Sequence, residues 1–284
     1  MSVARWVGVA GCALLAACHA PPPDPLLPAV VRVVQDRAPA TTGPTFDGRA
    51  DEMAAAVRAL VEGEDVRPQP RYVVARVALS TDERARALVP QGAPTTGEGL
   101  YVARRPGTAA ALAVEIPHPR SDRFTDEMGT AVFERTRARA LLMAGSLRDA
   151  GDDADVAHAG DAVFAAVDRA VVRPGWVVLQ LHGFSRERHP DYPAVVVAGG
   201  ATEPGEVLRG LAEGIGRAGF PVLVAEGGRG EQLAARTNVE GQHAARVGAQ
   251  FVHVEADDRV RDDPALRGRL VEAIVQVLRE VPAP

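Results

Sequence analysis

The stretch Val114-Glu-Ile-Pro-His-Pro-Arg-Ser-Asp122 joins the end of an apolar run to a polar turn. The apolar run covers residues 110–116 and stops at two prolines that flank His118, and Asp122 follows four residues after this histidine. An apolar run that breaks at proline is typical of a buried strand that carries polar side chains to the edge of a sheet. Open α/β sheets bind ligands just beyond the carboxyl ends of their strands. We therefore interpret this stretch as one half of a metal-dependent hydrolytic site.

The rest of the chain alternates between predicted strands and predicted helices. Apolar runs predict strands over residues 72–79, 100–104, 110–116, 140–144, 176–181, 194–198, 221–225 and 251–255. Apolar residues at helical spacing predict helices over residues 47–63, 81–88, 161–171, 203–218 and 264–281, with another that begins near Thr125. This alternation predicts an α/β fold with a mixed, mostly parallel central sheet and helices on both faces.

The N-terminal residues have the pattern of a secretory signal. Arg5 precedes an apolar stretch, residues 6–16, that is too short to span a bilayer as a mature helix. The stretch ends in Leu15-Ala-Ala-Cys18, which resembles the lipobox of bacterial lipoproteins. The resemblance implies that residues 1–17 are a signal peptide and that Cys18 carries the lipid, palmitate included. It also implies a lipid-anchored protein of the bacterial cell envelope, at the outer membrane in a Gram-negative host.

The remaining chain divides into a tether and one domain. Residues 18–46 begin with a proline-rich segment and predict a tether. Residues 47–284 predict a single α/β domain, in which residues 47–105 form either an N-terminal extension or a lid. The net charge of −5 and the lack of a basic run argue against nucleic-acid binding. Of the two cysteines, Cys12 lies in the predicted signal and Cys18 is the predicted lipid acceptor, which excludes cysteine catalysis.

Two histidines, His118 and His182, directly follow predicted strands. A catalytic zinc ion takes three protein ligands, usually histidines and a carboxylate, and keeps one position for water. His118, Asp122 and His182 form such a set, and Glu115 is an alternative ligand to Asp122. A general base is also needed to activate the water. Glu255, at the end of the last predicted strand, is the candidate for this role.

Several other polar residues are predicted to support this site. Strand alternation places His253 on the same face as Glu255. Asp155 and His158 form an Asp-x-x-His cluster, which either orients a metal ligand, is an alternative metal site, or only caps a helix beside a surface histidine. Arg148 is expected to hold a substrate carboxylate through two hydrogen bonds. Asn238 follows a glycine turn and is expected to line the substrate cleft.

The order of these residues resembles the superfamily of zinc carboxypeptidases, N-formylglutamate amidohydrolases and poly-γ-glutamate hydrolases. The segments that carry the likeness are residues 115–122, 144–148, 154–158, 179–184, 237–242 and 251–255. The resemblance implies a zinc-peptidase-like fold in which a histidine, a nearby carboxylate and a later histidine bind Zn²⁺. It also implies that a glutamate on a late strand acts as the base.

Two positions depart from the pattern of related sequences. Leu147 stands where a histidine is expected before Arg148, and Ala159 stands where an asparagine is expected after His158. These departures keep a second function open, that of a catalytically impaired, lipid-anchored binding or scaffold protein of the same fold. A third interpretation, an α/β-hydrolase esterase, lacks its Gly-x-Ser-x-Gly motif, to which Ser146 is the nearest approach.

The sequence therefore favours a zinc-dependent hydrolase. Its expected substrate carries a carboxylate and an amide bond, as in an N-acyl amino acid, a peptide or a γ-glutamyl chain.

Overall fold

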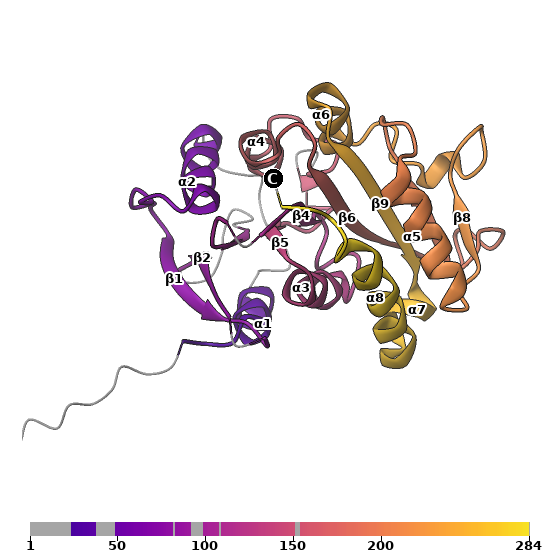
Figure 1. Cartoon of the computed structure of the whole chain (residues 1–284), viewed down its shortest axis with the longest axis horizontal. Coiled ribbons are helices and arrows are strands. Elements are labelled where there is room, and N and C mark those ends of the chain that lie inside the picture. Colours follow the sequence, from indigo (N-terminus) through magenta and orange to yellow (C-terminus); the bar gives the residue numbers. More distant parts are fainter. Residues whose placement is uncertain are drawn as a thin grey trace, which may run out of the picture.

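The computed structural model describes residues 24–37, 49–81, 83–91, 99–107, 109–150 and 154–283. The predicted signal peptide, Cys18 and much of the predicted tether lie outside these ranges. Within them, one sheet of nine strands runs through the molecule in the order β1-β2-β3-β5-β4-β6-β9-β7-β8 (Figure 1). The strands are β1 Tyr72–Ala78, β2 Arg84–Pro90, β3 Leu100–Arg104, β4 Ala110–Ile116, β5 Ala138–Met143, β6 Val177–Phe184, β7 Val195–Ala198, β8 Val222–Val224 and β9 Gln250–Asp257.

Parallel pairing forms the centre of this sheet. Strand β4 lies parallel to both β5 and β6, and β6 lies parallel to β9. The flanking pairs β1–β2, β2–β3, β3–β5 and β7–β9 are antiparallel, and β7 and β8 are parallel to each other. Every residue of β4 is buried, as expected for a strand that is covered on both faces. The predicted mixed α/β sheet is confirmed.

Helices cover both faces of the sheet, as the sequence predicts (Figure 1). One apolar cluster packs side chains of α1, α3, α5 and α8 against one face, and a second packs α2, α4 and α6 against the other. The helices on the first face are α1 Leu27–Arg37, α3 Thr125–Arg135, α5 Glu206–Arg217 and α8 Pro264–Leu278. Those on the second face are α2 Ala50–Glu62, α4 Val163–Val171 and α6 Val239–Val247, and the short α7 Asp258–Asp262 joins β9 to α8.

Two predictions about the N-terminal third are wrong. The predicted helix over residues 81–88 contains most of β2, because alternation of small or apolar residues with arginines suits a strand that pairs on both sides. The predicted tether contains helix α1, whose Leu27, Val31 and Val34 recur at helical spacing and are buried in the core. Strands β1, β2 and β3 extend the sheet beyond β5 and are therefore part of the sheet.

The register of the central strands places polar residues side by side. Glu115 on β4 is opposite Gln180 on β6, and β6 in turn aligns Gln180 with His253 and His182 with Glu255 on β9. Because strand side chains alternate with a period of two, these residues share the face that α4 and α6 cover. No helix among the described residues is long and apolar enough to cross a membrane.

Candidate metal centre

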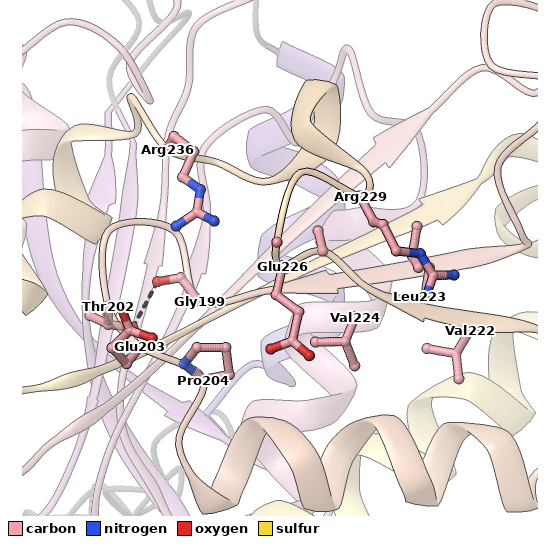
Figure 2. Close-up of a pocket in the computed structure, with 12 residues that line it drawn as sticks. Gly199, Thr202, Glu203, Pro204, Val222, Leu223, Val224, Glu226, Arg229 and Arg236 are labelled. Carbon is pink, nitrogen blue, oxygen red and sulfur yellow. Dashed lines mark hydrogen bonds between the residues drawn. The ribbon is translucent and has the colours of Figure 1, made fainter.

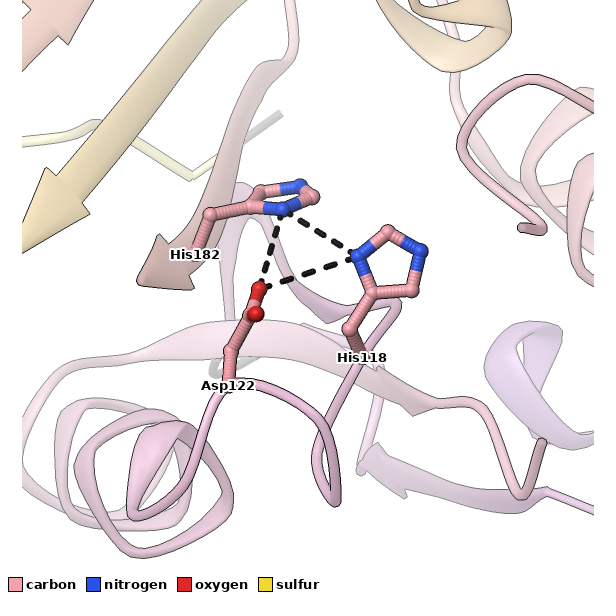
Figure 3. A group of neighbouring side chains, drawn as sticks. All are labelled: His118, Asp122 and His182. Carbon is pink, nitrogen blue, oxygen red and sulfur yellow. Dashed lines mark hydrogen bonds and ion pairs between the residues drawn. The ribbon is translucent and has the colours of Figure 1, made fainter. Parts of the chain in front are cut away.

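His118, Asp122 and His182 meet at the carboxyl end of the central strands (Figure 3). The Nδ1 atoms of His118 and His182 lie 3.3 Å apart, and Asp122 Oδ2 lies 3.3 Å from His182 Nδ1 and 3.7 Å from His118 Nδ1. All three side chains are buried, at 0%, 3% and 3% exposure. In the ranges that the structure describes, this is the one group of three His, Cys, Asp or Glu side chains that is close enough to hold a metal ion.

The turn after β4 brings Asp122 back toward His118. The backbone N–H of Asp122 donates to the carbonyl of His118, at 2.9 Å, and closes the turn. The Thr125 hydroxyl donates to the Asp122 carbonyl at 2.8 Å and ties the turn to the start of α3. Between them Phe124 adopts a left-handed backbone with φ of 70°, a conformation that costs a non-glycine residue energy. This turn explains how two ligands four residues apart face the same point.

The three facing atoms form a set that suits a cation. Burial and the neighbouring His253 lower the pKa of His182 to about 4, so that its imidazole is neutral at pH 7. Burial alone would raise the pKa of Asp122, but its contacts with His118 and His182 outweigh burial and hold that pKa well below the usual range. Asp122 Oδ2 is also buried without a hydrogen-bond donor. A carboxylate and imidazole nitrogens that face one another in this way match the ligand chemistry of Zn²⁺.

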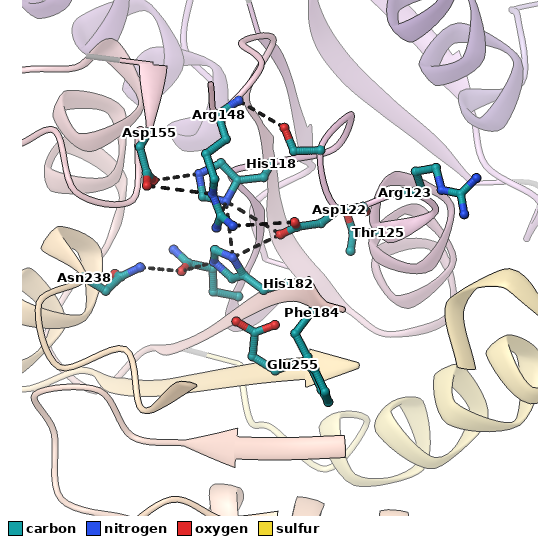
Figure 4. Close-up of polar contacts among 12 residues, drawn as sticks. His118, Asp122, Arg123, Thr125, Arg148, Asp155, His182, Phe184, Asn238 and Glu255 are labelled. Atoms are coloured by element: carbon teal, nitrogen blue, oxygen red, sulfur yellow. Dashed lines mark hydrogen bonds and ion pairs between the residues drawn. The ribbon is translucent and has the colours of Figure 1, made fainter. Parts of the chain in front are cut away.

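Asp155 contacts the outer nitrogen of His118. Its Oδ1 is 3.0 Å from His118 Nε2 (Figure 4). Its Oδ2 is 3.2 Å from His158 Nδ1. Burial lowers the pKa of His118, but contacts with Asp122 and Asp155 raise it more. A carboxylate on the outer nitrogen of a histidine orients the ring and leaves the other nitrogen for a metal. His158 is half-exposed and contacts the group only through Asp155.

Arg148 lies at the mouth of the group (Figure 4). Its Nη2 is 2.7 Å from His118 Nδ1, and its guanidinium also lies 3.9 Å from Asp122 and 3.8 Å from Asp155. The Arg148 backbone N–H donates to the Ser121 hydroxyl at 3.1 Å, which joins its loop to the turn after β4. The side chain is one-third exposed. The guanidinium of Arg148 is therefore hydrogen-bonded to His118 Nδ1, the same atom through which His118 would bind a metal ion.

Glu255 lies beside His182 on the neighbouring strand (Figure 4). Its Oε1 is 3.3 Å from His253 Nε2, while its Oε2 is buried with no hydrogen-bond partner. Burial would raise the pKa of Glu255, but His253 and His182 outweigh burial and lower it, so the side chain is a carboxylate at pH 7. The His253 ring packs against that of His182, with centroids 4.6 Å apart. Strand alternation had already placed His253 on this face.

Glu115, the alternative ligand, points into a separate buried cluster of polar side chains. Its Oε2 accepts from Gln180 Nε2 at 3.0 Å, and Glu240 Oε2 accepts from the same nitrogen at 3.3 Å. Asp168 completes the carboxyl cluster, and its Oδ2 is hydrogen-bonded to His243 Nδ1 at 2.6 Å. Burial and mutual repulsion raise the pKa of all three carboxyls well above their ordinary values. Glu115 is not among the three side chains that meet at the candidate metal centre.

Asn238 is buried at the start of α6 and contacts protein groups on both sides. Its Oδ1 accepts from the Gly241 backbone N–H at 2.8 Å, and its Nδ2 donates to Gln180 Oε1 at 2.7 Å. Gln180 also contacts His182 Nε2, at 2.8 Å. Sequence reasoning missed Gln180, although its position two residues before His182 places it on the same strand face. It also missed the carboxyl cluster, whose members are far apart in the sequence.

Three residues from the competing interpretations do not alter this geometry. The Ser146 hydroxyl is buried and donates to the Ala154 carbonyl at 3.2 Å, so it caps a loop. Ala159 packs in the apolar cluster on the α4 face. Leu147 is partly buried, and its carbonyl accepts from the Ala150 backbone N–H. Neither Leu147 nor Ala159 takes the place of a residue of the candidate metal centre.

A surface pocket of about 780 Å³ lies elsewhere, beside β7 and β8 (Figure 2). It is lined by Gly199, Thr202, Glu203, Pro204, Val222, Leu223, Val224, Ala225, Glu226, Gly227, Arg229 and Arg236. Within it, the Thr202 hydroxyl donates to the Gly199 carbonyl at 2.7 Å. None of the predicted site residues lines this pocket, so the pocket is separate from the candidate metal centre.

Several solved structures are similar to this chain at low sequence identity. A zinc-free apo form of YNDL is 14% identical, with a TM-score of 0.45 over 63% of this chain and 89% of that chain. A putative carboxypeptidase A from Shewanella denitrificans OS-217 is 13% identical, with a TM-score of 0.42 over 84% and 69%. A metallo-carboxypeptidase from Pseudomonas aeruginosa, in complex with (2-guanidinoethylmercapto)succinic acid, is 16% identical, with a TM-score of 0.41 over 83% and 68%.

Two of these structures are described as carboxypeptidases, and zinc carboxypeptidases are part of the superfamily that the sequence resembles. No protein-family model matches the chain, and no curated protein matches it in sequence. At these identities and TM-scores, any assignment of function depends on the geometry of the site itself.

The carboxyl cluster predicts a pH-dependent gain in stability for Glu115→Gln. The folded protein keeps a proton on a Glu115 whose pKa is raised, whereas the unfolded chain releases it above about pH 4.5. Wild-type stability therefore falls as the pH rises above that value, by up to about 1.4 kcal/mol per pH unit for one such group. We expect urea to unfold Glu115→Gln at a higher concentration than wild type at pH 8 and at a similar concentration at pH 4.

The exposed Glu213, replaced by Gln, is the matched control and should unfold like wild type at both pH values. An equal gain for Glu115→Gln at pH 4 and pH 8 would contradict the raised pKa. If Asp122 is the carboxylate ligand, Glu115→Gln should still bind one equivalent of Zn²⁺.

Proposed function

We propose that this chain is a zinc-dependent hydrolase that cleaves an amide bond in a carboxylate-bearing substrate. The proposal is based on one observation. His118 Nδ1, His182 Nδ1 and Asp122 Oδ2 lie buried within 3.7 Å of one another. Two imidazoles and one carboxylate are a known ligand set of catalytic zinc, which keeps a further position for water. A zinc ion held there would supply an acidified water and a Lewis acid for the substrate carbonyl.

In this proposal Glu255 is the general base. It comes from β9, the neighbour of the strand that carries His182, and its Oε2 has no competing donor. Its lowered pKa means that Glu255 is ionised at neutral pH, so that Oε2 can accept a proton from water. His253 holds the other oxygen of Glu255 and so fixes the direction in which Oε2 points.

Arg148 supports the choice of a carboxylate-bearing substrate. His118 Nδ1 cannot serve the guanidinium and a metal ion together, because it has a single lone pair. When this nitrogen is a ligand, the half-buried guanidinium is released at the mouth of the site. Its paired N–H groups then match a carboxylate in a bidentate arrangement. N-acyl amino acids, peptides and γ-glutamyl chains all present such a carboxylate near an amide bond.

The proposal also places the enzyme on a membrane. The lipobox-like Leu15-Ala-Ala-Cys18 supports lipidation at Cys18 and attachment at the cell envelope. Residues 19–26 then separate the lipid from α1. This attachment would bring the site near envelope peptides and their fragments.

Loss of a zinc ligand and loss of the general base should cause two different defects, one in zinc binding and one in turnover. His118→Ala should lose stoichiometric zinc, because one of three protein ligands is gone. Glu255→Gln should keep zinc, while its turnover of N-acyl amino acids or peptides should fall about 100-fold or more, since general base catalysis contributes about 10²–10⁴. Zinc is measured by mass spectrometry of the purified protein, and turnover by amine release.

Glu213→Gln serves as the control and should match wild type in both measurements. Full turnover by Glu255→Gln would refute its role as base. A wild-type protein that binds zinc but turns over no member of the substrate panel would favour the alternative of a lipid-anchored binding protein.

Competition at His118 predicts opposite effects of Arg148→Met on metal and substrate. Removing the guanidinium frees His118 Nδ1, so the dissociation constant for Zn²⁺ should fall about tenfold. The KM for carboxylate substrates should rise by about tenfold or more, whereas substrates with an amidated carboxylate should be affected little. The exposed Arg188, replaced by Met, is the control, and unchanged zinc affinity in Arg148→Met would contradict the competition.

The lipid anchor predicts that Cys18→Ser releases the protein from membranes. In cells that process lipoproteins, the wild-type protein should incorporate labelled palmitate and sediment with the membrane fraction. Cys18→Ser should do neither, whereas Cys12→Ser should behave as wild type. Membrane association of an unlabelled Cys18→Ser protein would reject this attachment.

A further inference from the structure

Gln180 links the candidate metal centre to the start of helix α6. It is fully buried and lies two residues before His182 on the same face of β6. Its Oε1 is 2.7 Å from Asn238 Nδ2 and 2.8 Å from His182 Nε2. Its Nε2 is 3.0 Å from Glu115 Oε2 and 3.3 Å from Glu240 Oε2. Each atom of its amide therefore has two polar partners.

The backbone of α6 determines which way these amides face. Asn238 is the N-cap of α6, and its side chain accepts from the Gly241 backbone N–H at 2.8 Å. A backbone N–H can only donate, so the Asn238 atom that faces it is the oxygen. The other end of the Asn238 amide is then the NH₂ group, which must donate to Gln180. The atom of Gln180 that receives this bond is consequently its carbonyl oxygen.

The same oxygen lies against His182 Nε2, so Nε2 must carry a hydrogen. A neutral imidazole has one N–H and one lone pair, so the lone pair of His182 is on Nδ1. Nδ1 is the atom that faces His118 Nδ1 and Asp122 Oδ2, at 3.3 Å from each. We propose that Asn238 and Gln180 are positioning residues that hold His182 in the tautomer with a free Nδ1 lone pair, an inference that rests on the proposed zinc site.

Asn238 also opposes the turned state of the Gln180 amide. A turned amide would place an N–H donor against the NH₂ group of Asn238, whose direction is fixed by the bond from the Gly241 N–H. It would also place its own NH₂ group against His182 Nε2. Two donors would then face each other in a buried space, where an unmet polar group is costly. The network gives Asn238 a role in the protein in place of the predicted contact with substrate.

The first test reads the tautomer directly in the metal-free protein. Two-bond ¹H–¹⁵N correlation spectra of ¹⁵N-histidine-labelled protein at pH 7.5 distinguish Nε2–H from Nδ1–H rings. His182 is assigned by the signals that disappear in His182→Gln. We expect His182 to be the Nε2–H tautomer. An Nδ1–H ring in wild type would overturn the inference whether or not the protein binds zinc.

The second test uses two variants at Asn238, both of which keep a good N-cap. In Asn238→Asp the carboxylate cannot donate to Gln180, so the Gln180 amide turns to donate to it and its NH₂ then faces His182 Nε2. The proton of His182 should move to Nδ1, and the dissociation constant for Zn²⁺ should rise about 10–100-fold, as for other lost partners of metal-bound histidines. Asn238→Ser removes the donor without forcing the turn, and its zinc affinity should stay closer to wild type.

Melting temperatures of both variants verify that they fold. Zinc binding by Asn238→Asp that is as tight as that of Asn238→Ser would overturn the inference. If wild type has the Nε2–H ring but binds no zinc, the proposed function fails while the tautomer assignment stands. If wild type binds one zinc ion with an Nδ1–H ring, the inference fails and the proposed function stands.

Discussion

The parallel register of β4, β6 and β9 is the constraint on which the site depends. It aligns Glu115 with Gln180 and His182 with Glu255, so that polar side chains from three strands gather on one face of the sheet. The alternate residues Leu179 and Leu181 are buried in the apolar cluster on the other face. A slip of β6 by one residue would exchange the two sets, and would bury Gln180 and His182 among leucines and valines. The apolar residues thereby hold the register that the polar residues need.

The molecule also buries several ionisable side chains. Burying an ionised group without a partner is costly, so such groups either pair or become neutral. Asp122 follows the first course: its pKa is lowered despite burial, and the guanidinium of Arg148 lies 3.9 Å from it. Glu115, Asp168 and Glu240 follow the second, with pKa values raised by burial and mutual repulsion. The raised pKa values of this cluster reduce the negative charge that lies beside Gln180 and the proposed ligands.

The residues of the site differ in exposure according to their proposed roles. His118, Asp122 and His182 are buried, while Arg148 is one-third exposed at the mouth. Buried ligands are held in place by packing and by partners such as Asp155 and Gln180, which favours a defined geometry. The partly exposed Arg148 is the residue that we propose to contact a substrate carboxylate. The departures at Leu147 and Ala159 leave the three facing side chains intact, so the site keeps the groups that zinc chemistry requires.

By itself the sequence determined the α/β class, the strand that ends at Ile116 just before His118, and the candidate set of His118, Asp122, His182 and Glu255. These follow from local signals, because apolar runs, prolines and alternation are properties of neighbours in the chain. Residues 81–88 were mistaken for a helix because alanine and arginine also favour helices, and only pairing with β1 and β3 decides for a strand. The contact of Arg148 with His118, the carboxyl cluster and the Asn238–Gln180–His182 network were decided by tertiary structure alone. Apart from the Gln180–His182 contact within β6, they join residues 30 to 75 positions apart. No local pattern records which of several buried polar groups will meet when the helices pack on the sheet.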